Sequence, residues 1–246
     1  MIRFIAVQHS YSEFLGPVEK QLENRGIGFT YFRPFTGQSL PVSAQQYDAL
    51  WLLGGTYPPA DREHVPWFEE ELRLARAFAR AGRPAVGFGF GALLLALAAG
   101  GTPSGSEVPY AYWTTARVTD AGAENPLARA VDGRKVLVAA SGRVRLPEGV
   151  QPLLVDESGE WIAWRQAQAY GLLFRPELTP GMIEDIIMEE GRPLPDDISA
   201  VLEQARQLWT QSRETSDRVI AALVAELDLM QERRKPPVFT LRTVQE

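Results

Sequence analysis

The sequence contains no cysteine and only two histidines, His9 and His64, among its 246 residues. Disulfide bonds, thiolate metal sites and cysteine nucleophiles are therefore excluded, and so is a histidine-rich metal centre. We expect no bound metal and no cofactor. The lack of cysteine does not identify the compartment.

Long apolar segments and basic clusters are also missing. The longest apolar run, residues 92–99, is too short to span a bilayer, and residues 1–7 resemble a short strand rather than a signal peptide. The formal net charge is −6, and lysine and arginine do not cluster before Arg233. A nucleic-acid partner is therefore not expected. Together these features predict a soluble, cytoplasmic protein without a membrane partner.

The first hundred residues alternate between buried-strand and helix patterns. Glycine-rich turns follow several of the predicted strands. Strands are predicted at residues 2–7, 28–33, 49–53 and 84–86, and helices at residues 16–25, 66–81 and 92–99. This order predicts a three-layer α/β domain with a mainly parallel central sheet. Ligands of such sheets usually bind at the carboxyl ends of the strands.

The rest of the chain has a different pattern. Short strand-like runs at residues 110–118, 135–139, 152–155, 161–165 and 170–174 predict a mixed β extension of the same domain. We expect residues 1–190 to form one domain, with residues 191–246 as a helical extension and tail packed on it.

The extension carries one apolar helical face from Ile198 to Met230. A single helix of that length would reach about 50 Å, and a break near residues 212–216 is the alternative. The run of three basic residues from Arg233 is expected to be a solvated helix end. Beyond it, residues 238–244 form a β-prone tail that could pair with a neighbouring chain.

Residues 87–92 (GFGFGA) link the fourth strand to an apolar helix and allow three interpretations. The glycines could simply permit a tightly packed turn. Gly87, Gly89 and Ala92 also fit the dinucleotide pattern G-x-G-x-x-A, which normally follows the first strand rather than the fourth. The third interpretation is a nucleophile elbow, a strained turn at the head of a helix.

The third interpretation has support elsewhere in the chain. Residues 87–92 resemble the G-x-C-x-G-A elbow of class I glutamine amidotransferases, with Gly89 at the place of the cysteine. Residues 47–55 (YDALWLLGG) resemble the oxyanion strand of that family, and residues 65–87 resemble its helix leading into the elbow strand. Residues 170–180 (YGLLFRPELTP) are similar to the segment that carries the catalytic histidine and glutamate. The resemblance implies the flavodoxin-like fold of the family.

The departures from the family pattern concern the catalytic groups. Gly89 replaces the nucleophile and Arg175 replaces the histidine, while Glu177 keeps the position of the residue that orients that base. Further departures fall at Leu93, residues 107–110 and residues 141–143. Glutamine hydrolysis by this route needs a thiolate and a base, and arginine stays protonated. The resemblance therefore implies a protein that does not hydrolyse glutamine.

A non-hydrolysing relative would act by binding. One hypothesis is a small anionic ligand held at the head of the elbow helix by Gly54, Gly55, Phe90, Arg175 and Glu177. A synthase-like protein partner, by analogy with the family, or a homodimer is the other.

Simpler roles and other chemistry stay open. Arg175 could have no role beyond an ion pair with Glu177 or Glu107. A different enzyme could reuse the pocket through Glu177, Arg175, Tyr110 or Tyr112, with Ser141 as the nearest hydroxyl nucleophile. His9 could border the pocket, but a solvated or hydrogen-bonded loop residue is the favoured interpretation. Asp48 has no partner that the sequence identifies.

Overall fold

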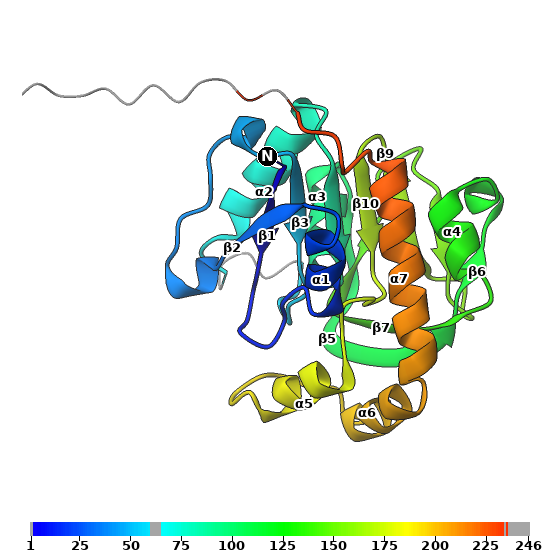
Figure 1. Cartoon of the computed structure of the whole chain (residues 1–246). Helices are drawn as coiled ribbons and strands as arrows, with labels where there is room; N and C mark the ends of the chain where they lie inside the picture. The colour runs from blue at the N-terminus through cyan, green and yellow to red at the C-terminus, as the bar shows by residue number, and fades with distance from the viewer. Residues whose placement is uncertain (1, 60–64, 234, 236–246) are drawn as a thin grey trace, which may run out of the picture.

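The computed structural model describes residues 2–59, 65–233 and 235. Its centre is an eight-stranded sheet in the order β2-β1-β3-β4-β10-β9-β8-β6 (Figure 1). The five strands at one side are parallel: β1 (Arg3–Val7), β2 (Gly28–Phe32), β3 (Ala49–Leu52), β4 (Ala85–Phe88) and β10 (Ala169–Leu172). The antiparallel strands β9 (Trp161–Gln166), β8 (Pro152–Val155) and β6 (Arg117–Val118) extend the sheet.

Helices cover both faces of this sheet. One face carries α1 (Pro17–Glu23), α4 (Pro126–Val131) and α7 (Trp209–Glu226), and the other carries α2 (Phe68–Arg80) and α3 (Phe90–Ala98) (Figure 1). Single turns of 3-10 helix lie at η1 (Pro34–Thr36), η2 (Ala44–Gln46) and η3 (Asp120–Gly122). The prediction of a three-layer, mainly parallel, flavodoxin-like α/β fold is therefore confirmed.

A two-stranded ribbon and a helical hairpin lie at the carboxyl ends of the parallel strands. The long strands β5 (Thr102–Thr115) and β7 (Lys135–Arg145) form an antiparallel ribbon. Beside the ribbon, α5 (Pro180–Met188) and α6 (Ile198–Gln207) form a helical hairpin (Figure 1). Hairpin and ribbon share a small apolar cluster that is separate from the main core. The candidate site lies between the central sheet and this ribbon and hairpin.

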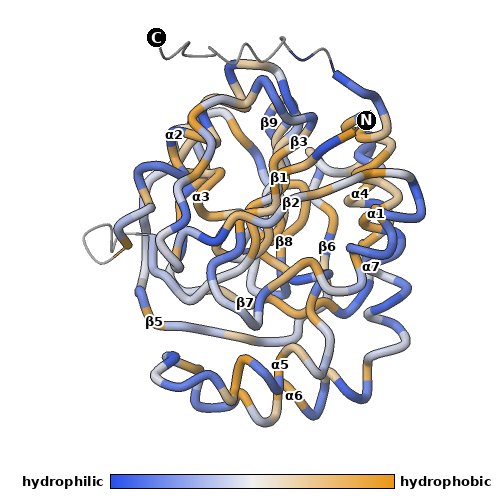
Figure 2. The backbone as a smooth tube through the Cα atoms, turned by 60° about the vertical axis from the view of Figure 1, so that its left-hand side comes forward, coloured by the Kyte–Doolittle hydropathy of each residue, from blue (hydrophilic) through white to orange (hydrophobic). Residues whose placement is uncertain are grey.

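The central elements are apolar because they are buried on every side. The helix α3 is buried from Phe90 to Leu97, since it packs against β4, β10, α2 and the β7 strand. A helix that is hydrophobic all round is typical of such a position. Segments of apolar residues accordingly run through the centre of the molecule, while polar residues lie mainly on the outer helices and loops (Figure 2). Residues 92–99, the apolar run that is too short to span a bilayer, thus belong to a core helix.

The C-terminal helical region breaks earlier than predicted. The break falls at Leu208, between α6 and α7, and not at residues 212–216. The two helices pack on different surfaces: α6 contacts α5 and β5, whereas α7 contacts α1 and α4. One straight helix could not cover both, so the chain changes direction where it passes from the hairpin to the sheet.

The expectation of a solvated basic end after this helix is wrong. The backbone N–H of Arg233 donates to Asp48 Oδ1 over 2.7 Å, and Lys235 Nζ lies 2.6 Å from Asp48 Oδ2. Asp48 Oδ2 also accepts from the N–H of Arg3 over 2.8 Å. The buried carboxylate therefore holds Arg233 and Lys235 at the amino ends of β1 and β3. His64 and the predicted tail at residues 238–244 lie outside the described residues.

No helix in the described part of the chain is long and apolar enough to cross a membrane.

Candidate functional site

The turn between β4 and α3 has the backbone of a strained elbow. Gly89, the N-cap of α3, has φ 53° and ψ −115°, a conformation that L side chains rarely adopt. A Cβ added there would lie 2.9 Å from the carbonyl oxygen of Ala139 and 2.9 Å from Cδ of Arg175. Both the backbone angle and the lack of space therefore require glycine.

The neighbouring glycines are explained by packing. A Cβ on Gly87 would overlap the backbone of Gly91, and a Cβ on Gly91 would overlap the backbone of Leu52. The N–H of Gly91 donates to the carbonyl of Leu53 over 3.1 Å, so it is already engaged within the protein. This close approach of α3 to β3 favours the packing interpretation over a phosphate cradle for a nucleotide.

Arg175 occupies the space between the end of β3 and the elbow. Its backbone N–H donates to Leu137 O over 2.8 Å, which fixes the start of the side chain. The guanidinium lies where a Cβ on Gly54 would be, and its side chain is 3% exposed. Nε donates to Glu177 Oε1 over 2.6 Å and Nη2 donates to Glu13 Oε1 over 2.8 Å. The arginine is thus held by two buried carboxylates.

Glu13 connects this arginine to the helical hairpin. Its second oxygen accepts from Arg192 Nη2 over 2.5 Å. Arg192 lies between α5 and α6, and its Nη1 also donates to Glu189 over 2.7 Å and to Ser10 Oγ over 3.1 Å. Burial alone would raise the pKa of Glu13, but the charges of Arg175 and Arg192 outweigh it and lower the pKa to about 2. Glu13 therefore stays ionised at any ordinary pH.

Glu177 has a different electrostatic environment. Burial is the largest influence and raises the pKa of Glu177, although the charge of Arg175 opposes it. Oε1 accepts from Arg175 Nε, whereas Oε2 is buried without a hydrogen-bond partner among the described residues. Arg175 alone therefore stabilises the ionised form of Glu177 less than Arg175 and Arg192 together stabilise that of Glu13.

His9 forms a second buried ion pair at this end of the sheet. Its Nε2 lies 2.7 Å from Glu71 Oε1 and its Nδ1 lies 2.8 Å from Gly54 O, while the ring contacts Phe90 edge-on at 4.9 Å. Burial lowers the pKa of His9, but the charge and hydrogen bond of Glu71 and the Gly54 carbonyl more than offset it, so the pKa is raised. His9 is therefore hydrogen-bonded, as favoured from the sequence, but buried rather than solvated.

The predicted site residues converge on this point. Gly54 and Arg175 are in contact, Arg175 binds Glu177, and a Cβ on Gly55 would lie 3.3 Å from Phe90. The suggested pairing of Arg175 with Glu107 is wrong, because Glu107 is exposed and Glu13 takes that role. Glu13, Arg192 and Glu71 were not predicted, since a charged residue in a loop or on a helix is usually a surface residue.

Of the residues suggested for other chemistry, Tyr110, Tyr112 and Ser141 lie in the β5–β7 ribbon. The hydroxyl of Tyr112 donates to Asp156 over 2.7 Å and accepts from Arg143 over 2.8 Å, and Tyr110 donates to Gly142 O over 3.0 Å. Burial raises the pKa of both tyrosines, so both phenols stay protonated at neutral pH. Ser141 Oγ is buried and makes no hydrogen bond to any described residue.

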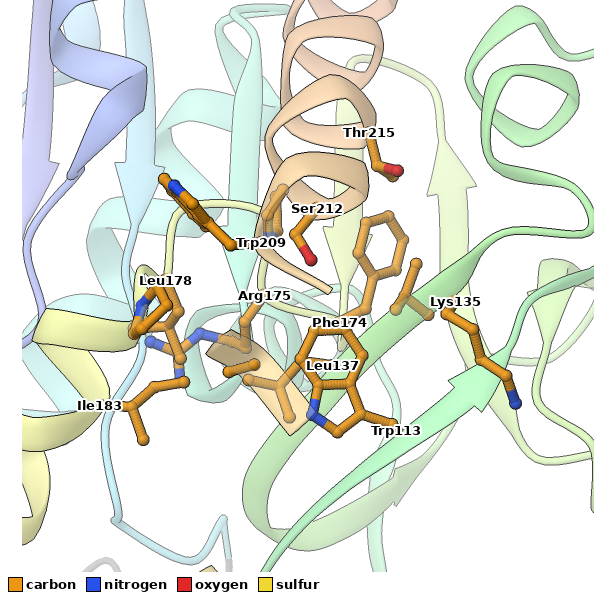
Figure 3. A pocket seen from close by; sticks show the side chains of 14 residues that line it. Trp113, Lys135, Leu137, Phe174, Arg175, Leu178, Ile183, Trp209, Ser212 and Thr215 are labelled. Atoms are coloured by element: carbon orange, nitrogen blue, oxygen red, sulfur yellow. The ribbon is translucent and has the colours of Figure 1, made fainter. Parts of the chain in front are cut away.

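Two small cavities flank Arg175. The first has a volume of about 20 Å³ and lies below α7, with Trp113, Leu137 and Phe174 around it and Ser212 and Thr215 above (Figure 3). The second lies against the α5–α6 hairpin and has a volume of about 50 Å³. Among the described residues, no group of three or more acidic or histidine side chains could hold a metal ion.

Comparison with known proteins gives this arrangement a family context. No protein family model matches the chain. The glutamine amidotransferase-like protein YfeJ of Salmonella typhimurium is 30% identical over 124 residues, which cover 49% of this chain and 52% of YfeJ. Over this stretch the chain is similar to a glutamine amidotransferase-like protein. It matches only about half the length of that relative.

Solved structures show the same fold over nearly the whole chain. A glutamine amidotransferase from Thermotoga maritima superposes with a TM-score of 0.73 at 19% identity, covering 94% of this chain and 99% of its own. A glutamine amido transferase from Methylobacillus flagellatus gives a TM-score of 0.74 at 19% identity, covering 97% and 98%. At these identities the structures establish the fold of the chain and not its activity.

Proposed function

We propose that this amidotransferase-like chain does not hydrolyse glutamine and acts by binding a partner protein. The resemblance gives Gly89 the position of the nucleophile and Arg175 the position of the base. Neither residue can perform the chemistry, because glycine has no side chain and arginine remains protonated. No cysteine elsewhere in the chain could substitute.

The observation that carries this proposal is the position of Arg175. Its guanidinium fills the space over Gly54, and its Cδ would lie only 2.9 Å from a Cβ at residue 89. Ion pairs to Glu13 and Glu177 hold it there. A nucleophile and a substrate amide would both need part of this volume. The loss of chemistry is therefore accompanied by occupation of the site.

The same geometry favours a protein partner over a small anion. Arg175 and the head of α3 were the expected anion site, together with Gly54, Gly55, Phe90 and Glu177. An anion beside Arg175 would lie near Glu13, which is ionised, and would have to displace one of its bonds to the arginine. A partner surface does not need access to this interior.

The C-terminal extension, residues 191–246, is the segment that we propose for the partner interface. Met230 in this segment is 55% exposed, and the apolar residues Val238, Phe239 and Leu241 follow it outside the described range. The simplest form of this interface is a homodimer, because most soluble oligomers are closed and two-fold. Light scattering on the full chain should give a dimer, and a chain ending at Glu232 should give a monomer. Equal masses for the two would remove the tail from the proposal.

An ammonia assay tests the absence of hydrolysis. The purified chain should release no ammonia from glutamine above background, and Gly89→Cys should stay inactive because Arg175 still occupies the base position. Unfolding of each variant is followed in parallel, so that an inactive unfolded protein is not mistaken for support. Clear turnover by the natural sequence that disappears in Glu177→Ala would refute the proposal.

A further inference from the structure

A groove lies at the amino ends of the parallel strands, between α2, α3 and the turn that joins β9 to β10. Alanines of both helices form its apolar floor, together with Leu95 and with Ala85 at the start of β4. Its volume is about 310 Å³. A cavity of about 150 Å³ is enough to hold a benzene ring, so this groove has room for an aromatic side chain and one aliphatic neighbour.

The rim of the groove is polar. Gln166 and Gln168 line it from the β9–β10 turn, and Arg83 lines it from the loop after α2. A glutamine side chain can both donate to and accept from a peptide backbone. An apolar floor beside such amides suits an extended peptide, because alternate side chains can enter the floor while the backbone bonds to the rim.

Contacts of Arg83 connect the groove to the described end of the chain. Its Nη1 donates to the carbonyl of Tyr47. The next residue, Asp48, accepts from the backbone N–H of Arg233 over 2.7 Å and lies 2.6 Å from Lys235 Nζ. Residues beyond Lys235 therefore continue from the side of the molecule that carries the groove.

Residues 236–246 have the composition that such a groove requires. They begin with Pro236-Pro237 and continue as VFTLRTVQE. Phe239 and Leu241 would share one face of an extended segment, because successive side chains alternate between faces. At about 3.3 Å per residue, the segment would reach roughly 35 Å, which is enough to cross to a second molecule.

The two prolines favour the groove of a second copy over the chain's own groove. Proline holds φ at about −65°, and a residue that precedes proline is restricted to extended conformations. Lys235 and Pro236 both precede a proline. The chain therefore continues straight beyond Lys235 and does not turn back to a groove that begins beside it. Reciprocal exchange between two copies would close a two-fold dimer.

We propose that residues 236–246 of one copy bind in the groove of a second copy. Phe239 and Leu241 lie on the apolar floor, and the backbone bonds to Gln166 and Gln168. The proposal rests on the proposed function, because it takes the C-terminal extension as the interface and a second copy as the partner. It adds the surface that receives the extension, at the end of the sheet opposite to the candidate site.

Two matched substitutions on α2 test the groove in the full chain. Ala79 and Ala81 are both exposed, and of the two only Ala79 lines the groove. Ala79→Trp should weaken dimerisation about tenfold or more in analytical ultracentrifugation, because the indole fills the groove, and Ala81→Trp should leave it unchanged. Thermal unfolding verifies that both variants fold. A dimer of Ala79→Trp as tight as that of the natural chain would overturn the groove.

Mixing two full-chain variants tests the exchange between copies. Phe239→Asp puts a charge on the segment but leaves the groove open, whereas Ala79→Trp blocks the groove but leaves the segment intact. Each variant alone should be a monomer, and the mixture should give a heterodimer that is weaker than the natural dimer, since one of two contacts remains. Thr240→Asp carries the same charge on the other face and should still dimerise. A mixture without heterodimer, from a chain that dimerises naturally, would overturn the exchange.

The same measurements distinguish this inference from the proposed function. A natural chain that is a monomer would remove the extension as an interface and overturn both. A natural dimer that persists in Ala79→Trp and in Phe239→Asp would overturn only the groove. Ammonia release from glutamine, together with a heterodimer from the mixture, would overturn the absence of hydrolysis while supporting the exchange.

Discussion

Buried charges occur at both ends of the sheet, and the two clusters are built differently. At the carboxyl ends, Arg175 and Arg192 alternate with Glu13 and Glu177, and every one of these side chains is at most 6% exposed. At the amino ends, the buried carboxylate of Asp48 binds two backbone N–H groups and Lys235, whose side chain is 20% exposed.

The difference shows what each cluster does. The carboxyl-end cluster closes an interior space, so each charge depends on another buried charge. The amino-end cluster holds Arg233 and Lys235 against the sheet, and water can replace part of what Asp48 provides. We therefore expect the site end to tolerate substitution much less than the anchor end.

Loss of Arg175 should have the largest effect. Arg175→Met leaves Glu13 and Glu177 buried with less compensation, and should lower the free energy of unfolding by about 3–5 kcal/mol. Urea denaturation measures this. A triple variant that adds Glu13→Gln and Glu177→Gln should recover most of the loss, because no uncompensated carboxylate remains. A single variant within about 1 kcal/mol of the natural protein would contradict an interior ion cluster.

A substitution at the elbow should come next. Gly89→Ala should lower the free energy of unfolding by about 1–3 kcal/mol, because alanine is strained at φ 53° and meets Ala139 and Arg175. Gly149 is the matched control, since it has φ 78° and nothing within 4 Å of an added Cβ. Gly149→Ala reports the backbone cost alone and should be milder. Equal losses at the two positions would show that the elbow is not crowded.

The anchor end should be less sensitive. Asp48→Asn should cost about 1–2 kcal/mol at neutral pH, because the amide keeps one acceptor but loses the charge. Burial raises the pKa of Asp48, but bonds from Lys235, Arg233 and Arg3 outweigh it and lower the pKa. This stabilisation is present above the unfolded pKa of about 4 and is lost as the pH falls through the lower folded value.

Urea titrations from pH 7 down to about pH 2 check this dependence. The acid-side loss of stability should be smaller in Asp48→Asn than in the natural protein. The exposed Asp185 on α5 provides a control, because Asp185→Asn makes the same change of side chain away from the anchor. Identical acid limbs for Asp48→Asn and the natural protein would contradict the anchor.

His9 gives the smallest effect and sharpens the picture of the site end. Its raised pKa means that the ion pair with Glu71 stabilises the fold fully below the unfolded pKa of about 6.5 and less as the pH rises through the folded pKa. The loss should not exceed about 1.4 kcal/mol per pH unit. Glu71→Gln should flatten this alkaline slope in stability measurements between about pH 6 and 9. An unchanged slope would mean that His9 is neutral in the folded protein.

The layers of this fold, and the edge of the sheet at which the candidate residues meet, could be predicted from the sequence because both follow from local patterns. Apolar runs and helical periodicity gave the parallel strands, and residues 87–92 gave the elbow. The convergence of Gly54 and Arg175 followed from the rule that carboxyl ends of parallel strands share one edge.

The partners of Arg175 could not be predicted in the same way. Glu13 lies 162 residues away in sequence, and Arg192 lies in a connection without periodicity. Nothing local distinguishes such residues from solvated charges, because their pairing depends on how the hairpin packs on the loop after β1. The break at Leu208 escaped prediction for a related reason, since it depends on which surfaces α6 and α7 cover.

An experimental electron-density map of the region between Gly55, Gly89 and Arg175 tests the central claim most directly. The account predicts continuous density for the guanidinium against Gly54, with Nε bonded to Glu177 and Nη2 bonded to Glu13. Density that places Arg175 outside this space, with an open pocket or an ordered anion at the head of α3, would contradict it.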